Sequence, residues 1–429
     1  MRVIVDLHLH SCYSRATSKR MHLKEIARFA EIKGLNIVGT GDFTHPKWLE
    51  EIQEVLVQEP SFGLYRVAKN DDSTVYFMVT TEVSTVFTFR GEIKKIHHLI
   101  LTPNIETAVQ INERLATFGN LEIDGRPTLN MSAPQLVEEV MKTSRQNMVI
   151  PAHVWTPWFS VFGAFSGFDK IEDCYQDMGK YIFALETGLS SDPPMNWRLS
   201  KLDDYALISN SDSHSFWPWR MGREANVFEL KKPSYREILD ALRCNDRDRF
   251  RFTIETDPAY GKYHWSGHRN CNVALSPKEA KELGSICPVC RRKITKGVEQ
   301  RLEELADRPA GFKPENARDF VRLLPLSEII KTVRGATSPY NQKVWDVYNR
   351  LVRKFNNEYA VMMDASEKML NEVVDDEIAK AIVRVRNELV KVIPGYDGVY
   401  GKLVIFHENS TEEYYPHRVH QQNLTEFMR

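Results

Sequence analysis

The sequence lacks a long hydrophobic run, which excludes a protein that crosses a membrane on helices. None of its apolar stretches approaches the ~20 residues that a transmembrane helix needs. A basic and apolar signal peptide is also missing, because Asp6, His8 and His10 interrupt the apolar residues at the N-terminus. We therefore expect a cytoplasmic protein without a membrane partner.

An excess of one charge is missing as well. The chain has 57 Lys and Arg against 58 Asp and Glu, a formal net charge of −1. Bulk electrostatics therefore give no attraction to nucleic acid, and any such contact must use local charge. Basic residues do gather between Arg220 and Arg243 and again between Arg291 and Lys296. Bound divalent ions would add positive charge that formal counting omits.

Cysteine is scarce, with six residues in 429, and three of the six are scattered. The other three lie in the segments YHWSGHRNC and SICPVC, where two pairs of metal-binding residues have the same two-residue spacing. Two such pairs about 15 residues apart are typical of a structural zinc site. The predicted ligands of one structural Zn are His268, Cys271, Cys287 and Cys290. His264 is the alternative to His268.

The length of the chain allows two or three domains. Short apolar runs alternate with helical patterns up to about residue 255, which predicts an α/β fold with a mainly parallel sheet of the barrel type. Beyond Ala317 the pattern is mostly helical, and 375–393 is the clearest amphipathic segment. We expect a barrel at 1–255, a zinc-binding module at 256–315, a helical domain at 316–420 and a tail at 421–429.

Polar residues that bind metals follow several of the apolar runs. After the run 3–5, His8 and His10 are two residues apart, so in an extended segment their side chains point to one face. Together the run ends contain His8, His10, Asp42, His45, Glu82, His97, His98, His153, Glu186, Asp212 and His214. Imidazoles mixed with carboxylates suit Zn, Mn or Fe better than Mg or Ca. Since the set exceeds what one ion can use, we expect two or three divalent ions, with Zn, Mn and Mg as candidates, and Glu82 as a bridging ligand.

The motifs DLHLH, TGDFTHP, PAH and SDSH resemble those of the PHP (polymerase and histidinol phosphatase) superfamily. The resemblance implies a distorted (β/α)7 barrel with up to three metals at the carboxyl ends of its strands, and hydrolysis of phosphoesters. By position it implies the ligands His8, His10, Glu82, His98, His153, Asp212 and His214. His97 is the alternative to His98, which lies closer to the apolar run 99–101. Asp42 and His45 stand where the superfamily usually has Asp-His, so a third metal is an open question.

Two aromatic stretches follow predicted ligands, one after His153 and one after His214. Aromatic side chains in loops can stack on a nucleic-acid base, although they can also fill a core beneath a long loop. The candidate base-binding and DNA-binding residues are Trp155, Trp158, Phe159, Trp217, Trp219 and Arg220.

The last residues resemble a sliding-clamp interaction box. One helical turn would present Leu424, Phe427 and Met428 as a single apolar plug with Gln421 beside it.

A PHP barrel followed by a zinc module and a helical region resembles the endonuclease Q family of DNA repair nucleases. The resemblance implies cleavage 5′ to a deaminated base (uracil, hypoxanthine or xanthine) or an abasic site, leaving a 3′-hydroxyl and a 5′-phosphate. It implies damaged double- or single-stranded DNA and a sliding clamp as partners, at the nucleoid. By this resemblance 1–255 is the catalytic barrel, 316–420 the helical DNA-binding domain and 421–429 the sliding-clamp interaction tail. Asp212, His214 and His153 are the expected catalytic residues, and either histidine is a candidate to protonate the leaving oxygen. A small-molecule phosphatase and a DNA-binding scaffold with a degenerate metal site are the alternatives.

Overall fold

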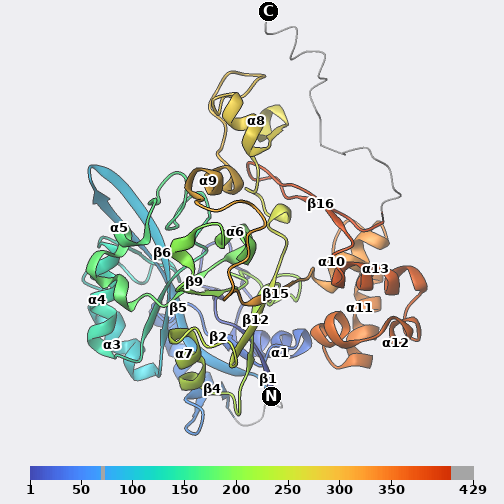
Figure 1. Ribbon diagram of the computed structural model, residues 1–429. Coiled ribbons are helices and arrows are strands. Elements are labelled where there is room, and N and C mark those ends of the chain that lie inside the picture. The colour runs from blue at the N-terminus through green and yellow to red at the C-terminus, as the bar shows by residue number, and fades with distance from the viewer. Residues whose placement is uncertain (69–72, 407–429) are drawn as a thin grey trace, which may run out of the picture.

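The computed structural model describes residues 1–68 and 73–406, and a mixed sheet forms the centre of the fold (Figure 1). The path of this sheet is β15-β12-β11-β1-β2-β5-β4-β3, with β6 and β7 attached to β5, and β8 to β6. Its strands are β1 Arg2–Asp6, β2 Ile37–Gly39, β3 Leu56–Glu59, β4 Leu64–Val67, β5 Tyr76–Phe89, β6 Glu92–Thr102, β7 Thr128–Leu129, β8 Met148–Pro151, β11 Ala225–Glu229, β12 Phe250–Glu255 and β15 Asp319–Arg322. The α/β class is confirmed. The expectation of a mainly parallel sheet is wrong, because β1–β11, β5–β6 and β6–β8 pair antiparallel.

Two further strands complete the barrel. β9 Ala184–Glu186 and β10 Ala206–Ile208 pair parallel to each other. No ladder joins β10 to β1; instead the His10 amide donates to the Ser213 carbonyl at 3.0 Å and the Leu7 amide to Asn210 Oδ1 at 2.8 Å. The ring of β1, β2, β5, β6, β8, β9 and β10 is therefore the expected distorted barrel, closed partly by polar side chains.

The longer helices of the barrel cover its outside (Figure 1). They are α1 Leu23–Lys33, α2 Pro46–Val55, α3 Ile105–Leu115, α4 Ala133–Thr143 and α7 Tyr235–Arg243, with the shorter α5 Ile171–Tyr175 and α6 Pro193–Asn196. Helix α1 ends at Gly34, whose φ of 98° lies in a region that only glycine adopts without steric strain. Ser234 begins α7 by accepting from the Glu237 amide, as its sequence predicts. Short 3-10 turns lie at Gln176–Tyr181, Gly188–Ser190, Ser200–Leu202, Pro258–Tyr260 and Arg269–Cys271.

The segment after the barrel forms a small module that projects from the body (yellow, with α8, in Figure 1). It contains the hairpin of β13 Ser266–His268 and β14 Val273–Leu275, then α8 Pro277–Glu282 and α9 Val298–Leu305. A core of its own, with Val273, Leu275 and Ile294, lies around the buried Cys287. Arg301 of α9 fixes it to the barrel by donating to the carbonyls of Phe162 and Phe168, each at 3.1 Å.

The remaining chain is mostly helical. Its elements are α10 Leu326–Val333, α11 Gln342–Phe355, the π-helix Ala360–Asp364, α12 Glu367–Asn371, α13 Asp376–Arg386, and the hairpin of β16 Lys391–Ile393 and β17 Lys402–Val404. The expectation of one helix over 375–393 is wrong, because α13 ends at Arg386 and Glu388 has a φ of 53°. β15 also differs from the helical pattern expected there, and it pairs parallel with β12 of the barrel.

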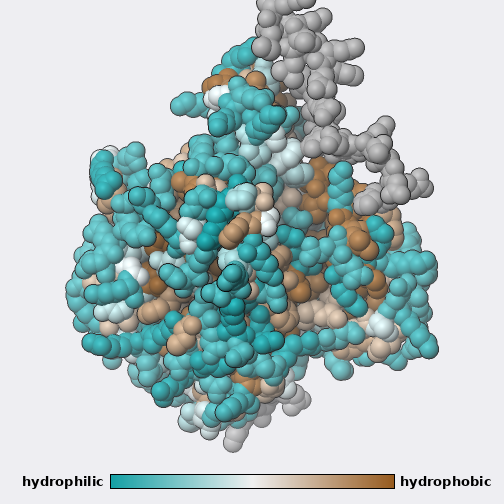
Figure 2. All heavy atoms as spheres, in the orientation of Figure 1, coloured by the Kyte–Doolittle hydropathy of each residue, from teal (hydrophilic) through white to brown (hydrophobic). Residues whose placement is uncertain are grey.

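A buried ion pair connects the barrel to this helical region. Lys33 Nζ lies 2.7 Å from Glu358 Oε1 and donates to the Pro218 carbonyl at 2.9 Å. Glu358 also accepts from the Tyr348 hydroxyl at 2.8 Å. The face in Figure 2 is mostly hydrophilic, with hydrophobic residues gathered toward the helical region. Among the described residues no helix has the length and apolar character to cross a membrane.

Candidate metal centre

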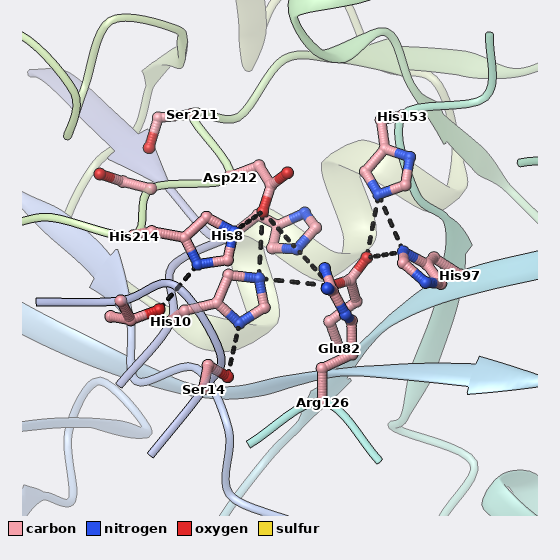
Figure 3. A network of polar contacts seen from close by, with 12 residues as sticks. His8, His10, Ser14, Glu82, His97, Arg126, His153, Ser211, Asp212 and His214 are labelled. Atoms are coloured by element: carbon pink, nitrogen blue, oxygen red, sulfur yellow. Dashed lines mark hydrogen bonds and ion pairs between the residues drawn. The ribbon is translucent and has the colours of Figure 1, made fainter. Parts of the chain in front are cut away.

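Two groups of metal-binding side chains meet at the mouth of the barrel and share Glu82 of β5 (Figure 3). The first group is His8, His10, Glu82 and Asp212, and the second is Glu82, His97 and His153; within each, the ligand atoms lie within 4.8 Å of one another. Glu82 Oε2 lies 3.4 Å from His8 Nε2 and 3.3 Å from His10 Nε2. Glu82 Oε1 lies 2.8 Å from His97 Nδ1 and 3.0 Å from His153 Nε2. Each oxygen of one carboxylate thus faces a different group.

The donors fit divalent metal ions. His8 Nε2 is buried and has no hydrogen-bond partner among the described residues, although burying an unpaired polar atom is costly. It lies 3.6 Å from Asp212 Oδ1, and His10 Nε2 lies 3.0 Å from the same oxygen. Imidazole nitrogens with carboxylate oxygens are the donors that Zn and Mn accept. The shared Glu82 gives the arrangement expected of a bridging ligand.

Buried carboxylates orient the histidines from behind. Both oxygens of Glu186, at the end of β9, lie 3.0 Å from His8 Nδ1, and Glu186 Oε2 accepts from the His153 amide at 2.8 Å. Asp42 Oδ1 lies 2.9 Å from His10 Nδ1. Such contacts fix the tautomer and leave each Nε2 free to face a metal ion.

The electrostatics keep the carboxylates ionised. Burial alone would raise the pKa of Glu82, but His97, Arg126 and His8 outweigh it and hold that pKa well below its usual value. Burial opposes protonation of His8, yet Glu186, Glu82 and Asp212 raise its pKa well above the usual value. Burial lowers the pKa of His97 to about 4, against the attraction of Glu82. The buried carboxylates of the cluster are therefore negatively charged, and the positive charges of neighbouring side chains stabilise them.

Three residues at the strand ends have strained backbones. Asp42, His153 and Asp212 have φ values of 48°, 31° and 47°, in the left-handed region that residues with a Cβ rarely adopt. Such strain persists where the surroundings determine the conformation, and it gathers at functional sites.

Several expected ligands lie outside the two groups. His98 contacts the Thr85 hydroxyl and the Tyr175 hydroxyl, each at 2.9 Å, so the preference for His98 over His97 is corrected. Neighbouring residues of a strand point to opposite faces, and closeness to 99–101 did not reveal which face is inside. His45 Nε2 instead lies 3.2 Å from the Glu122 carbonyl.

Asp42 and His214 lie beside the cluster. Asp42 is placed as a support of His10, because its Oδ2 also accepts from the amide and hydroxyl of Ser11. His214 stacks on His10, with ring centroids 4.4 Å apart, while its Nε2 is 3.8 Å from Asp212 Oδ1.

Arg126 is a member of the site that the sequence did not reveal. Its Nη1 lies 3.0 Å from Glu82 Oε2 (Figure 3). It lies in a loop without periodicity or a motif, so only the fold brings it to the metal ligands.

The aromatic candidates separate into buried and exposed residues. Trp155 is 1% exposed and donates to Asn196 at 2.8 Å, and Trp219 is 8% exposed. Trp217 and Trp219 stack on each other and meet the edge of Trp345 in the helical region. The expectation that Trp155, Trp217 and Trp219 stack on a base is therefore corrected: Trp155 and Trp219 are buried, and the half-buried Trp217 packs against Trp219 and Trp345.

The other candidate DNA-binding residues, Trp158, Phe159 and Arg220, are exposed or partly exposed. Trp158 is 40% exposed and stacks on Phe165 at 4.9 Å. Phe159 packs on His97 at 4.7 Å. Arg220 lies over the Tyr400 ring at 5.8 Å.

The four expected zinc ligands lie together in the projecting module. The ligand atoms of His268, Cys271, Cys287 and Cys290 lie within 4.8 Å of one another, with Cys290 Sγ 3.3 Å from His268 Nδ1. His264 instead lies 3.4 Å from Glu299, which favours His268. Four converging donors fit a closed, tetrahedral structural zinc site. The expected clamp residues Gln421, Leu424, Phe427 and Met428 lie outside the described residues.

Comparisons with known proteins find relatives of this chain. The family model of the MJ0043 C-terminal domain matches residues 325–389. The protein MJ0043 of Methanocaldococcus jannaschii is 31% identical over 254 residues, which is 58% of this chain but 31% of MJ0043, so the chain spans under a third of that relative. YqxK of Bacillus subtilis is 26% identical, with 94% of this chain and 99% of YqxK covered.

Solved structures match along nearly the whole chain. The lesion-specific endonuclease PfuEndoQ from Pyrococcus furiosus superposes with a TM-score of 0.84 and 34% identity, covering 96% of this chain and 98% of that one. Endonuclease Q in complex with a 27-mer duplex substrate, with an abasic lesion at the active site, has the same TM-score and identity, with 96% and 99% covered. The fold, the metal-binding groups and this similarity place the chain in the endonuclease Q family.

Proposed function

We propose that this protein is a metal-dependent DNA repair endonuclease that cuts the phosphodiester 5′ to a deaminated base or an abasic site. The observation that carries the proposal is the pair of ligand groups sharing Glu82 at the barrel mouth. Paired metal ions suit phosphodiester hydrolysis because they bind both the attacking and the leaving oxygen. The solved endonuclease Q with an abasic-lesion duplex supports a DNA lesion as the substrate, and the deaminated bases are part of this proposal.

The residues of the site would have two kinds of role, as metal ligands and as supports of the ligands. His8, His10, Glu82 and Asp212 would hold one ion, and Glu82, His97 and His153 a second. Bound there, the ions would supply Lewis acidity and an activated water for attack on phosphorus. Glu186 and Asp42 keep the imidazoles in place, and the buried setting strengthens every charge interaction with the phosphate.

The leaving 3′ oxygen needs a proton, and His214 and His153 remain the candidates to supply it. His214 is the more accessible of the two, with 31% of its side chain exposed against 8% for His153. His153 Nε2 faces Glu82, which suits a ligand better than an acid. His214→Asn should therefore slow cleavage of a normal linkage more than that of a linkage with a good 3′ leaving group, which a rate comparison would measure.

The lesion nucleotide would leave the duplex, a step that costs least for a mispaired or missing base. Trp158 and Phe165 offer an exposed stacked pair beside the cluster, because Phe159 links their loop to His97. Arg220 lies in the loop between β10 and β11, where its guanidinium donates to the Tyr400 hydroxyl at 3.5 Å. We assign DNA contacts to these residues.

Incubation of the metal-loaded protein with uracil, hypoxanthine, abasic and undamaged oligonucleotides tests the proposal. We expect a single cut 5′ to each lesion, with 3′-hydroxyl and 5′-phosphate ends, and no cut in undamaged DNA. Asp212→Asn should abolish cleavage and keep DNA binding. Release of phosphate from small phosphomonoesters, without any cut in lesion DNA, would instead support the phosphatase alternative. Binding of DNA without hydrolysis of either substrate would support the scaffold.

The tail 421–429 keeps its proposed role in binding a sliding clamp. Deleting it should remove clamp affinity, measured by surface plasmon resonance, and leave basal nicking unchanged. Unchanged clamp affinity after the deletion would refute this assignment.

A further inference from the structure

Arg126 reaches the centre of the metal-binding cluster with most of its hydrogen-bonding capacity unused. Its Nη1 donates to Glu82 Oε2 at 3.0 Å, and its side chain is 26% exposed. The described residues provide no other acceptor to its guanidinium, which carries five N–H donors. Figure 3 draws this guanidinium beside Glu82, where the two ligand groups meet.

The segment that carries Arg126 is held firmly. The Gly125 amide donates to the Tyr13 carbonyl at 3.2 Å, and its carbonyl accepts from the Thr44 hydroxyl at 3.1 Å. The Pro127 carbonyl accepts from the Ser84 amide at 2.9 Å. A Cβ at Gly125 would lie 2.2 Å from Asp42 Oδ2, so only glycine allows this approach to the metal-binding side. The residues on both sides of Arg126 are thus bound to three segments of the barrel, at Tyr13, Thr44 and Ser84.

Neutralising Glu82 does not by itself explain this residue. Four imidazoles already lie within 3.4 Å of the two Glu82 oxygens. A counter-ion would gain most from complete burial against its carboxylate, whereas Arg126 keeps a quarter of its side chain exposed at the mouth. A planar cation with free, diverging N–H groups matches the oxygens of a phosphate.

We infer that Arg126 binds a non-bridging oxygen of the scissile phosphate and stabilises the negative charge that grows there during attack. The inference rests on the proposed function. In that reaction water adds its oxygen to phosphorus, the bond from phosphorus to the 3′ oxygen breaks, and that oxygen takes a proton. Arg126 stays protonated throughout, and its N–H groups only donate hydrogen bonds. It is therefore a catalytic residue that contacts the substrate, in addition to the expected metal ligands.

The test compares Arg126→Ala and Arg126→Lys with wild type and with Arg114→Ala. Arg114 is a matched control because it lies on α3, on the outside of the barrel, where it pairs with Glu139 of α4. We expect Arg126→Ala to lower the single-turnover rate on an abasic duplex by about 10²–10³-fold, as loss of one transition-state donor does. Arg126→Lys should restore part of the rate, and Arg114→Ala should match wild type.

A second readout does not depend on the activity of the metal-loaded enzyme. With the mouth ions left out and the structural zinc kept, wild type should bind the abasic duplex several-fold more tightly than Arg126→Ala does. A neutral methylphosphonate at the scissile position should remove that difference, because the charge that Arg126 contacts is gone.

Rates within about threefold of wild type for Arg126→Ala, or a binding difference that the methylphosphonate leaves intact, would overturn the inference. A loss of metal in Arg126→Ala equal to its loss of rate would also overturn it, in favour of a purely structural role. If wild type does not cut lesion DNA, the proposed function fails instead.

Discussion

Replacing Glu82 with glutamine tests whether one carboxylate serves both ligand groups. The substitution keeps the shape of the side chain and removes its charge. Glu82 Oε2 faces His8 and His10, and Oε1 faces His97 and His153, so the change reaches both groups at once. Replacing residues that only orient ligands costs about 10–100-fold in metal affinity. Since Glu82 offers an oxygen to each group, we expect a loss of at least about 100-fold at each, or about 2.7 kcal/mol.

The assay is metal stoichiometry by native mass spectrometry, with affinities from competition against a chelator. Wild type should bind two ions at the mouth besides one zinc in the projecting module. Glu82→Gln should lose both mouth ions together, whereas His97→Ala should lose one. Glu139→Gln on the surface of α4 is the control for a lost carboxylate and should lose none. A Glu82→Gln protein that releases one ion, or neither, would refute the shared ligand and with it the paired-metal arrangement.

Three further perturbations follow from buried groups elsewhere. Lys33→Met should lower the free energy of unfolding by about 3–5 kcal/mol, because it leaves Glu358 buried without its cation; urea denaturation measures this, and Lys33→Met with Glu358→Gln should recover part of the loss. Burial raises the pKa of Glu255 to about 8 in the folded protein. The protonated carboxyl therefore contributes its full free energy of stabilisation below the pKa of the unfolded chain, and this contribution is lost as the pH rises toward 8. Glu255→Gln should remove this pH-dependent loss, which amounts to at most about 5 kcal/mol of the free energy of unfolding. A melting temperature of Glu255→Gln with the same pH dependence as that of wild type would contradict this. Cys287→Ser should release one zinc and expose 264–300 to proteolysis without loss of the mouth ions, and full zinc content in that variant would contradict the site.

The sequence predicted the ligands whose position follows from strand geometry alone. His8 and His10 share a face because they are two residues apart at a strand end, and Asp212 follows an apolar run in the same way. The sequence led to a preference for His98 over His97, because the face to which each residue of an antiparallel strand points depends on the register with the neighbouring strand. Along β6 the register puts His97 opposite Ser84 and His98 opposite Val83.

Other parts of the site depend on contacts between distant segments. Arg126 lies in a loop, and its approach to Glu82 depends on Gly125. The need for glycine there follows only from the fold, which brings Asp42 so close that a Cβ would clash with its carboxylate. The aromatic stretches look the same in sequence whether their side chains fill a core or line a surface. Trp219 packs against Trp345, over a hundred residues later in the chain, and only this contact shows that Trp219 is a core residue.

The parallel pairing of β15 with β12 has a consequence for how the chain is made. A ribosome that has released only residues 1–255 exposes β12 as a bare sheet edge, with its outer hydrogen-bonding groups open to solvent or to another chain. Residues 319–322 must emerge before that edge is covered, after the zinc-binding hairpin has already left the exit tunnel. During that interval the open edge of the nascent barrel is prone to aggregation, and binding by a chaperone would be most useful then.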